Sequence, residues 1–252
     1  MTRNLTFIRG LAVAGAAGLL LTGCGGNEPP VPGENGTNNP DGGGDSSGSS
    51  SYGVMAEWDG CEALDDVQAV QDFMGVTDWG TNGIMSSDIP GGLDGEAFNC
   101  GGAANLAVYL MENEVTGDKE IPGTANIDVG VAPWESDSEA AENFQERVDQ
   151  LKEAIETGGT EYSNVQEGEI EGDWDGSYYY AGASNTGFNA DAIAYKGDLV
   201  LYVFIDYTTD PAVQDGADPV YPFTDESIVD WMLNDYMPTT YSDLLAKKES
   251  GL

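Results

Sequence analysis

The sequence predicts an α+β protein: an antiparallel β-sheet with a long central helix and terminal helices packed on one face, and one disulfide bond. Two observations predict this class. Strand-like segments in the second half of the chain follow one another through short turns, which is typical of antiparallel sheets. A long amphipathic segment, residues 136–157, separates them from two earlier strand-like segments and has helical spacing.

The first part of the folded region is predicted to contain one helix, a loop and two strands. Residues 62–74 carry apolar side chains at helical spacing, and Gly75 follows as a stop. Residues 76–99 are rich in Gly, Ser and Asp and show no sustained period, so we expect a long loop. Residues 104–112 and residues 127–131 alternate as strands do.

Residues 136–157 give the clearest helical pattern. Ser136 and Glu139 fit a capping box at its start, and Gly158 and Gly159 fit its end. An apolar stripe recurs at steps of four, three and four residues, at Phe144, Val148, Leu151 and Ile155. Because the opposite face is charged, we expect this helix to pack one side on the sheet.

The second half is predicted to be rich in strands. We expect them at residues 161–171, 177–183, 187–195 and 198–207. The last is apolar on both faces, as expected of a central strand that is covered on both sides. A helix capped by Thr224 should follow and end at Pro238, which has no backbone N–H. A short amphipathic turn with Leu244 and Leu245 is expected to close the chain.

Composition excludes several classes of function. The 252 residues include 45 acidic, 8 basic and no histidine residues, for a formal charge of −37. A His-based catalytic triad and a zinc site with imidazole ligands are therefore excluded, and a pI near 4.1 argues against a nucleic-acid partner. Because the acids are spread along the chain, we interpret the charge as adaptation to a salty or alkaline exterior. A surface for a cationic partner or calcium is the alternative.

The N-terminus has the pattern of an export signal. Residues 1–10 are basic, and residues 11–21 are an apolar run too short to cross a hydrocarbon core of ~30 Å. The run ends in Leu-Thr-Gly-Cys at residues 21–24, which resembles the lipobox of bacterial lipoproteins. The resemblance implies diacylglycerol transfer to Cys24, cleavage after Gly23 and anchoring on the extracytoplasmic face of the cell membrane. An ordinary secretory signal is the alternative.

The chain is therefore expected to have three parts. Residues 1–23 are the predicted signal peptide. Residues 24–53 are rich in Gly, Ser and Pro and cannot bury enough apolar surface to fold, so they form a lipid-anchored, disordered tether with a reach of ~30 Å. Residues 54–252 are expected to form one extracytoplasmic domain.

Two cysteines remain once Cys24 is assigned to lipid. An even number in an oxidising compartment indicates a disulfide between Cys61 and Cys100. A redox-active pair is the alternative, and it lacks the CxxC spacing that lowers a thiol pKa.

The surroundings of the first of these cysteines carry a second resemblance. Residues 59–64 read Asp-Gly-Cys-Glu-Ala-Leu, and an amphipathic helix, a glycine and a second cysteine before a strand follow. The pattern resembles uncharacterised actinobacterial two-cysteine lipoproteins. In the order of its elements it is also similar to the extracellular sensor domains of some mycobacterial receptor kinases. Over residues 58–246 the resemblance implies an α+β domain with a cleft that senses or binds a ligand. It supplies no catalytic residues, and the strong acidity departs from the expected pattern.

Trp174, Tyr178 and Tyr180 form the candidate ligand surface. In a strand, Tyr178 and Tyr180 face one way and Tyr179 the other. An exposed aromatic stripe would suit a small apolar or saccharide ligand. Ordinary sheet packing is the alternative, since tyrosine favours strands.

No catalytic residue, metal site or cofactor is predicted. Residues 173–177 and 215–218 look faintly like calcium loops but lack the EF-hand register. The sequence therefore predicts a non-catalytic, membrane-anchored binding or sensing lipoprotein. The alternatives are an acidic envelope protein that docks a cationic partner and, after it, a carboxylate-based hydrolase.

Overall fold

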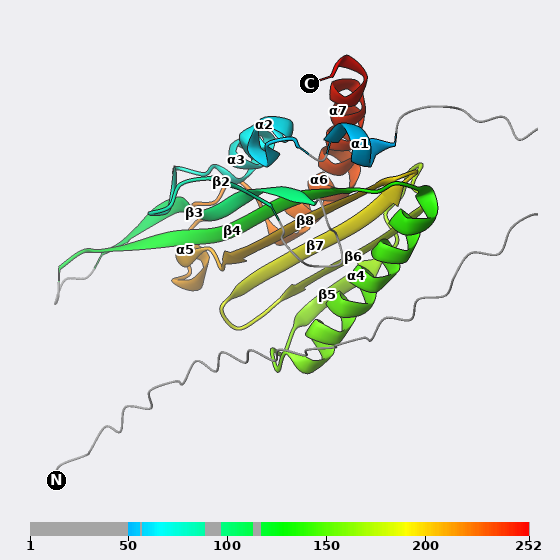
Figure 1. The fold of residues 1–252 in the computed structure, drawn as a ribbon. Helices are drawn as coiled ribbons and strands as arrows, with labels where there is room; N and C mark the ends of the chain where they lie inside the picture. The colour runs from blue at the N-terminus through cyan, green and yellow to red at the C-terminus, as the bar shows by residue number, and fades with distance from the viewer. Residues whose placement is uncertain (1–49, 56, 89–96, 113–116, 252) are drawn as a thin grey trace, which may run out of the picture. The chain divides into compact units, whose positions relative to one another are not determined.

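The structure is a computed structural model that describes residues 50–55, 57–88, 97–112 and 117–251 (Figure 1). Cys24, the predicted signal peptide and the predicted tether up to residue 49 lie outside the described residues. Within the described part of the chain, no helix combines the length and the apolar character needed to cross a membrane.

Eight strands of the described residues form one antiparallel sheet (Figure 1). Their order is β1-β3-β4-β8-β7-β6-β5, and β2 also pairs with β3. The strands are β1 Asp78–Trp79, β2 Met85–Asp88, β3 Phe98–Met111, β4 Lys119–Pro133, β5 Ser163–Gly168, β6 Gly176–Ala183, β7 Gly187–Lys196 and β8 Leu199–Thr208. The predicted α+β class and antiparallel sheet are confirmed.

Strand β8 lies in the middle of the sheet and is buried on both sides. Val203 and Ile205 pack into the larger apolar core on one face, whereas Val200 and Tyr202 pack into a smaller core on the other. All four side chains are at most 1 % exposed. The prediction of a central strand that is covered on both faces is confirmed.

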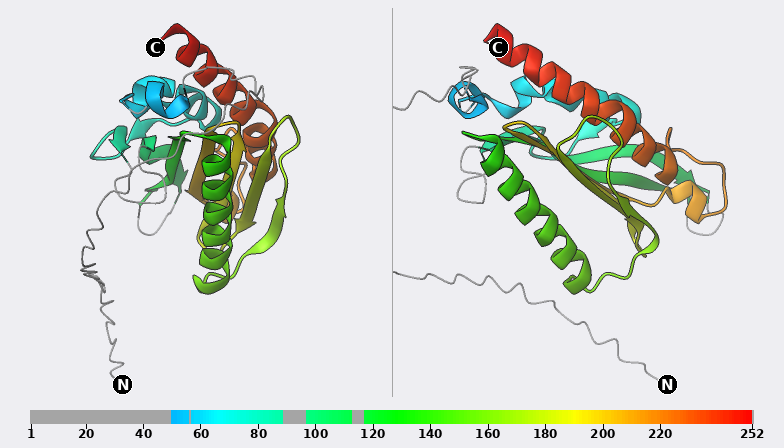
Figure 2. Two further views of the ribbon diagram at one scale, coloured as in Figure 1. Left: turned by 45° about the vertical axis from the view of Figure 1, so that its right-hand side comes forward. Right: turned by 90° about the vertical axis from the view of Figure 1, so that its right-hand side faces the viewer.

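The helices cover both faces of the sheet (Figure 2). They are α1 Ser51–Met55, α2 Gly60–Ala63, α3 Gln68–Met74, α4 Asp137–Thr157, α5 Pro211–Gln214, α6 Asp225–Trp231 and α7 Met237–Ser250, with a 3-10 turn at Asp65–Val67 and a π-helical segment at Met232–Tyr236. Helix α4 packs on one face, while α2, α3, α6 and α7 pack on the other. The predicted placement of all helices on one face is wrong in this respect: helices cover both faces because β7 and β8 carry apolar side chains on both sides.

The predicted helix over residues 62–74 is broken in the structure. Helix α2 begins earlier, because the Asp59 carboxylate accepts hydrogen bonds from the backbone N–H groups of Cys61 and Glu62, both at 3.0 Å. The chain then enters the left-handed region from Asp65 to Val67, with φ near +50°. Aspartate tolerates this region better than most residues, so the two acids permit the turn that separates α2 from α3.

The predicted helix stop at Pro238 is wrong. The chain passes from α6 through the π-helical segment into α7, and Pro238 lies in the first turn of α7. Tyr236 and Met237, which precede Pro238, are also helical, so the proline lies inside a continuous helix, and the π-helical segment just before it marks where the regular α-helical hydrogen-bond pattern is interrupted. The predicted closing turn at Leu244 and Leu245 is part of α7, and Leu244 is buried.

The predicted loop over residues 76–99 contains strands β1 and β2. Strand β2 pairs with β3 from Met85 opposite Gly101 to Asp88 opposite Phe98. Strands β3 and β4 both begin earlier than predicted. Glycine, serine and aspartate have low strand propensity, so it is pairing with β3 that makes this short segment extended.

The first helix of the described residues begins slightly before the predicted domain start at residue 54. Helix α1 begins at Ser51, whose backbone N–H donates to Asp198 Oδ2 at 2.5 Å. Lys248 Nζ of α7 donates to Ser51 Oγ at 2.6 Å. Ser51 is fully buried, so these contacts attach the start of the domain to its last helix and to the β7–β8 turn.

Salt is expected to stabilise this domain. Residues 54–252 carry a formal charge of −35, and counterions weaken repulsion between exposed carboxylates. Raising NaCl from ~0.05 M to ~1 M should raise the thermal midpoint by about 5 °C or more, measured by circular dichroism. The salt effect should shrink at pH 4, where many carboxylates are protonated. A midpoint that is unchanged or lower in salt at pH 7 would contradict this account.

Candidate functional site

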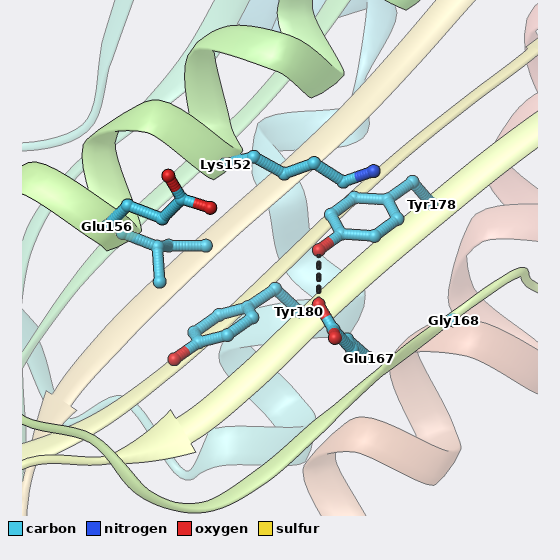
Figure 3. Close-up of a pocket in the computed structure, with 7 residues that line it drawn as sticks. Lys152, Glu156, Glu167, Gly168, Tyr178 and Tyr180 are labelled. Carbon is cyan, nitrogen blue, oxygen red and sulfur yellow. Dashed lines mark hydrogen bonds between the residues drawn. The ribbon is translucent and has the colours of Figure 1, made fainter.

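Two of the three predicted ligand residues lie together beneath helix α4. Tyr178 and Tyr180 point from β6 toward α4 (Figure 3), whereas Tyr179 packs against the core on the opposite face. The predicted alternation along the strand is thus confirmed. The two rings are only 8 % and 3 % exposed. Most of each side chain is therefore packed against other residues. The two tyrosines do not form the exposed aromatic stripe that would have suited a ligand.

A cavity of about 490 Å³ lies against these two rings, between α4, β5 and β6 (Figure 3). We call it the tyrosine cavity. Its volume lies in the range of small-molecule sites, ~300–1,000 Å³. It is lined by Lys152, Ile155 and Glu156 of α4, Glu167 and Gly168 of β5, and Tyr178 and Tyr180 of β6.

Charged groups hold Tyr178 in place from two sides. Its hydroxyl donates a hydrogen bond to Glu167 Oε2 at 2.8 Å, and Lys152 Nζ lies 4.6 Å from the centre of its ring. Burial, and then the hydrogen bond to Glu167, raise the pKa of Tyr178 above its ordinary value. The hydroxyl therefore stays protonated, and the lysine makes a cation–π contact with the ring.

Tyr180 is positioned by a second aromatic contact. Its ring meets that of Tyr162 edge to face, with centroids 5.5 Å apart. Burial raises the pKa of Tyr180, and the neighbouring groups Tyr162, Glu167 and Asp191 add to this rise. Tyr180 therefore presents a neutral hydroxyl, and its ring orientation is set by packing.

Asp191 of β7 is a partly buried carboxyl group beside the cavity wall. It pairs across the strands with Tyr180 and with Phe204. Burial, and next the charge of Asp206, raise its pKa to about 7. Such a shift occurs in catalytic sites and in structural carboxylates alike. Asp191 is not among the described residues that line the tyrosine cavity.

Trp174 does not join the tyrosine cavity. It lies in the connection between β5 and β6 and meets Tyr241 of α7 edge to face, with centroids 5.4 Å apart. Its ring packs against the larger core, on the face opposite α4. Proximity in sequence was misleading because this connection turns to the other face before β6 begins.

Sequence reasoning missed the charged lining residues Lys152, Glu156 and Glu167. Lys152 lies four residues after Val148, so it borders the apolar stripe of α4, and that spacing could have identified it. Glu167 has no comparable signal. It enters the site only because β5 pairs with β6, with Glu167 opposite Tyr180.

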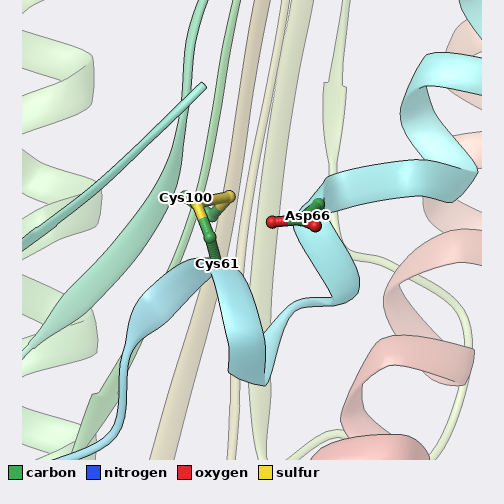
Figure 4. A group of neighbouring side chains, drawn as sticks. All are labelled: Cys61, Asp66 and Cys100. Atoms are coloured by element: carbon green, nitrogen blue, oxygen red, sulfur yellow. A yellow bond between two sulfur atoms is a disulfide. The ribbon is translucent and has the colours of Figure 1, made fainter. Parts of the chain in front are cut away.

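The predicted disulfide between Cys61 and Cys100 is confirmed (Figure 4). It joins α2 to β3, and both sulfurs belong to buried residues. The Asp66 carboxylate lies within 4.8 Å of both sulfurs. Since the sulfurs are bonded to each other, they cannot act as thiolate ligands, and the three residues do not form a metal site.

The acidic stretches that faintly resemble calcium loops make protein contacts. Asp173 pairs with Lys196, and Asp175 Oδ2 accepts a hydrogen bond from the backbone N–H of Gly197 at 2.7 Å. Asp215 accepts from the Tyr109 hydroxyl at 2.8 Å. These contacts stabilise turns and the ends of strands.

Comparison of the chain with models of known protein families, with curated proteins and with solved structures finds no match. The likeness to bacterial lipoproteins and sensor domains therefore stays a prediction from short motifs.

Proposed function

We propose that this protein is a lipid-anchored, extracytoplasmic module that binds a small hydroxylated ligand of the saccharide class, without catalysis, in the tyrosine cavity. The observation that carries the proposal is the lining of that cavity. It combines two tyrosines and an isoleucine with charged groups of both signs.

The chemistry of the lining favours a hydroxylated ligand over an apolar one. Lys152 supplies hydrogen-bond donors, while Glu156 and Glu167 supply acceptors. A saccharide hydroxyl both donates and accepts, so it can satisfy either kind of group. A purely apolar ligand would displace water from the charged groups and leave them without compensation. Ile155, which is partly exposed, offers apolar surface to the C–H face of a sugar ring.

The anchor is tested by mass spectrometry of the full-length protein, expressed in a bacterium that processes lipoproteins and extracted from its membranes. We expect the chain to begin at Cys24 and to carry covalently bound acyl chains. The variant Cys24→Ser should remain unacylated and unprocessed. A wild-type chain that is cleaved elsewhere, or that is released unacylated into the medium, would overturn the proposed localisation.

Ligand binding is tested with the same membrane-extracted protein on an array of bacterial envelope saccharides, followed by calorimetry with the best binder. Glu167→Gln removes a charged acceptor at the cavity and should weaken binding about tenfold or more, since hydrogen bonds to charged groups contribute ~1.5–3 kcal/mol. Tyr179→Phe, on the same strand but the opposite face, serves as the control and should bind normally. If no saccharide binds, or if both variants bind like the wild type, the tyrosine cavity is not the site.

A further inference from the structure

A second cavity lies on the face of the sheet opposite the tyrosine cavity. It has a volume of about 410 Å³ and is formed by the end of β8, the segment 209–224 and the first turn of α6. We call it the β8–α6 cavity. It is lined by Tyr207, Thr209, Asp210, Val213, Pro219, Tyr221, Phe223, Thr224, Asp225 and Glu226. The two cavities share no lining residue.

Three buried aromatic rings form a corner in this cavity. The rings of Tyr221 and Phe223 are nearly parallel, 19° apart in plane and 5.3 Å between centroids. Tyr207 stands almost perpendicular to Phe223, at 87° and 5.0 Å. All three side chains are less than 8 % exposed. The corner is therefore held by packing, and a ligand meets only the small part of each ring that faces the cavity.

The charged groups of this cavity are all negative. Asp225 and Glu226 are exposed residues of α6, and among the described residues no lysine or arginine lines the cavity. The Tyr207 hydroxyl donates to Asp225 Oδ1 at 2.7 Å, which holds this carboxylate beside the aromatic corner. Burial and the Asp225 carboxylate both raise the pKa of Tyr207, so its hydroxyl remains a neutral donor.

Asp210 differs from the other two acids because the backbone already compensates it. Its carboxylate accepts hydrogen bonds from the N–H groups of Ala212, Val213, Val220 and Tyr221, at 2.8–3.4 Å. These bonds fix the two ends of the segment that carries the cavity wall. Asp225 and Glu226 thus remain as the carboxylates that can act on a ligand.

We propose that the β8–α6 cavity binds a small organic cation with an alkylated ammonium group. The faces of aromatic rings attract such cations, and quaternary ammonium groups are weakly hydrated, so they lose little on entering an apolar corner. The carboxylates of Asp225 and Glu226, which line the cavity, compensate the charge of the cation. An inorganic cation such as Ca²⁺ fits less well, because it requires six to eight oxygen ligands and gains nothing from aromatic walls.

The test uses full-length protein in detergent and two ligands of one shape. Choline carries a quaternary ammonium, and 3,3-dimethylbutan-1-ol is its neutral carbon isostere. Calorimetry at constant ionic strength, balanced with NaCl, should show choline binding about tenfold or more tighter than the isostere. Equal affinity of the two, or no choline binding up to ~10 mM, would overturn the proposal.

Variants that neutralise one exposed carboxylate at a time locate the site. Glu226→Gln and Asp225→Asn should each weaken choline binding about threefold to tenfold, since each removes a carboxylate that lines the cavity. Asp230→Asn is the matched control: it lies on the same helix and loses the same charge, but it does not line the cavity. If all three variants weaken binding equally, the general negative charge of the protein attracts the cation and the cavity is not its site.

The result of the choline experiment is independent of the proposed saccharide binding, because the two cavities share no lining residue. Glu167→Gln, on the opposite face, should leave choline binding unchanged. Choline binding can therefore fail while saccharide binding succeeds, and the reverse, so each result bears on one cavity alone.

Discussion

Replacement of both bonded cysteines, Cys61→Ala with Cys100→Ala, is expected to lower the free energy of unfolding by about 4 kcal/mol. The bond closes a loop of sequence separation 39, and its loss restores the freedom of that loop in the unfolded chain. Urea unfolding followed by circular dichroism measures the change. A loss below ~1 kcal/mol would show that the unfolded chain is constrained in other ways.

Two controls isolate the effect of the bond. Reduction of the wild-type protein with dithiothreitol should reproduce most of the loss, because it breaks the same bond. Cys24→Ser, which changes the third cysteine and lies outside the described residues, should leave the free energy of unfolding unchanged.

Asp191→Asn is expected to stabilise the protein at pH 8 and to leave it nearly unchanged at pH 4. The pKa of Asp191 is raised to about 7 in the fold, by burial and then by the charge of Asp206. The native state therefore holds this proton more tightly than the unfolded chain, whose aspartates ionise near pH 4. Stability is lost as the pH rises from about 4 to about 7, and the loss is complete above the folded pKa.

The size of this effect follows from the shift in pKa. Each unit corresponds to about 1.4 kcal/mol, and partial solvent access reduces the total, so we expect Asp191→Asn to gain about 2 kcal/mol at pH 8. The difference between variant and wild type is measured by urea unfolding from pH 4 to pH 8. Asp235→Asn, at an exposed position on the other face, controls for the removal of one charge. Equal gains for both variants, or a gain that does not grow with pH, would contradict the assignment.

Elements with strong local periodicity could be predicted from the sequence. Helix α4 occupies the predicted range, and Ser136 Oγ accepts a hydrogen bond from the Glu139 N–H at 3.3 Å, as the capping pattern indicates. Strands β6, β7 and β8 also lie where alternation and the Lys196–Gly197 turn place them. In these segments the residues that define the pattern face the core: on α4, Val148 is buried, and Phe144, Leu151 and Ile155 are partly buried and pack against the same cluster.

Features that depend on distant partners could not be predicted. Strand β2 is extended because it pairs with β3, although its own residues, Met85–Asp88, have little strand character. The face of the sheet on which each helix packs depends on the path of the connections between the elements. The apolar periodicity within a helix shows which side of the helix is buried, but not which face of the sheet it packs on.

The tyrosine cavity was predictable in part. The common orientation of Tyr178 and Tyr180 follows from strand geometry alone. Its charged lining comes from α4 and β5, so the pairing of Glu167 with Tyr178 depends on a register that only the folded sheet defines. Trp174 shows the opposite error: a neighbour in sequence that the fold carries to the other face.

The attachment of Ser51 determines how the domain would bear mechanical load. Tension on the chain ahead of Ser51 passes first through its hydrogen bonds to Asp198, at the turn between β7 and β8, and to Lys248 of α7. Strands β7 and β8 have hydrogen-bonded neighbours on both sides. A pulling force therefore reaches the centre of the sheet and the last helix together, whereas an edge strand under the same force would peel away one hydrogen bond at a time.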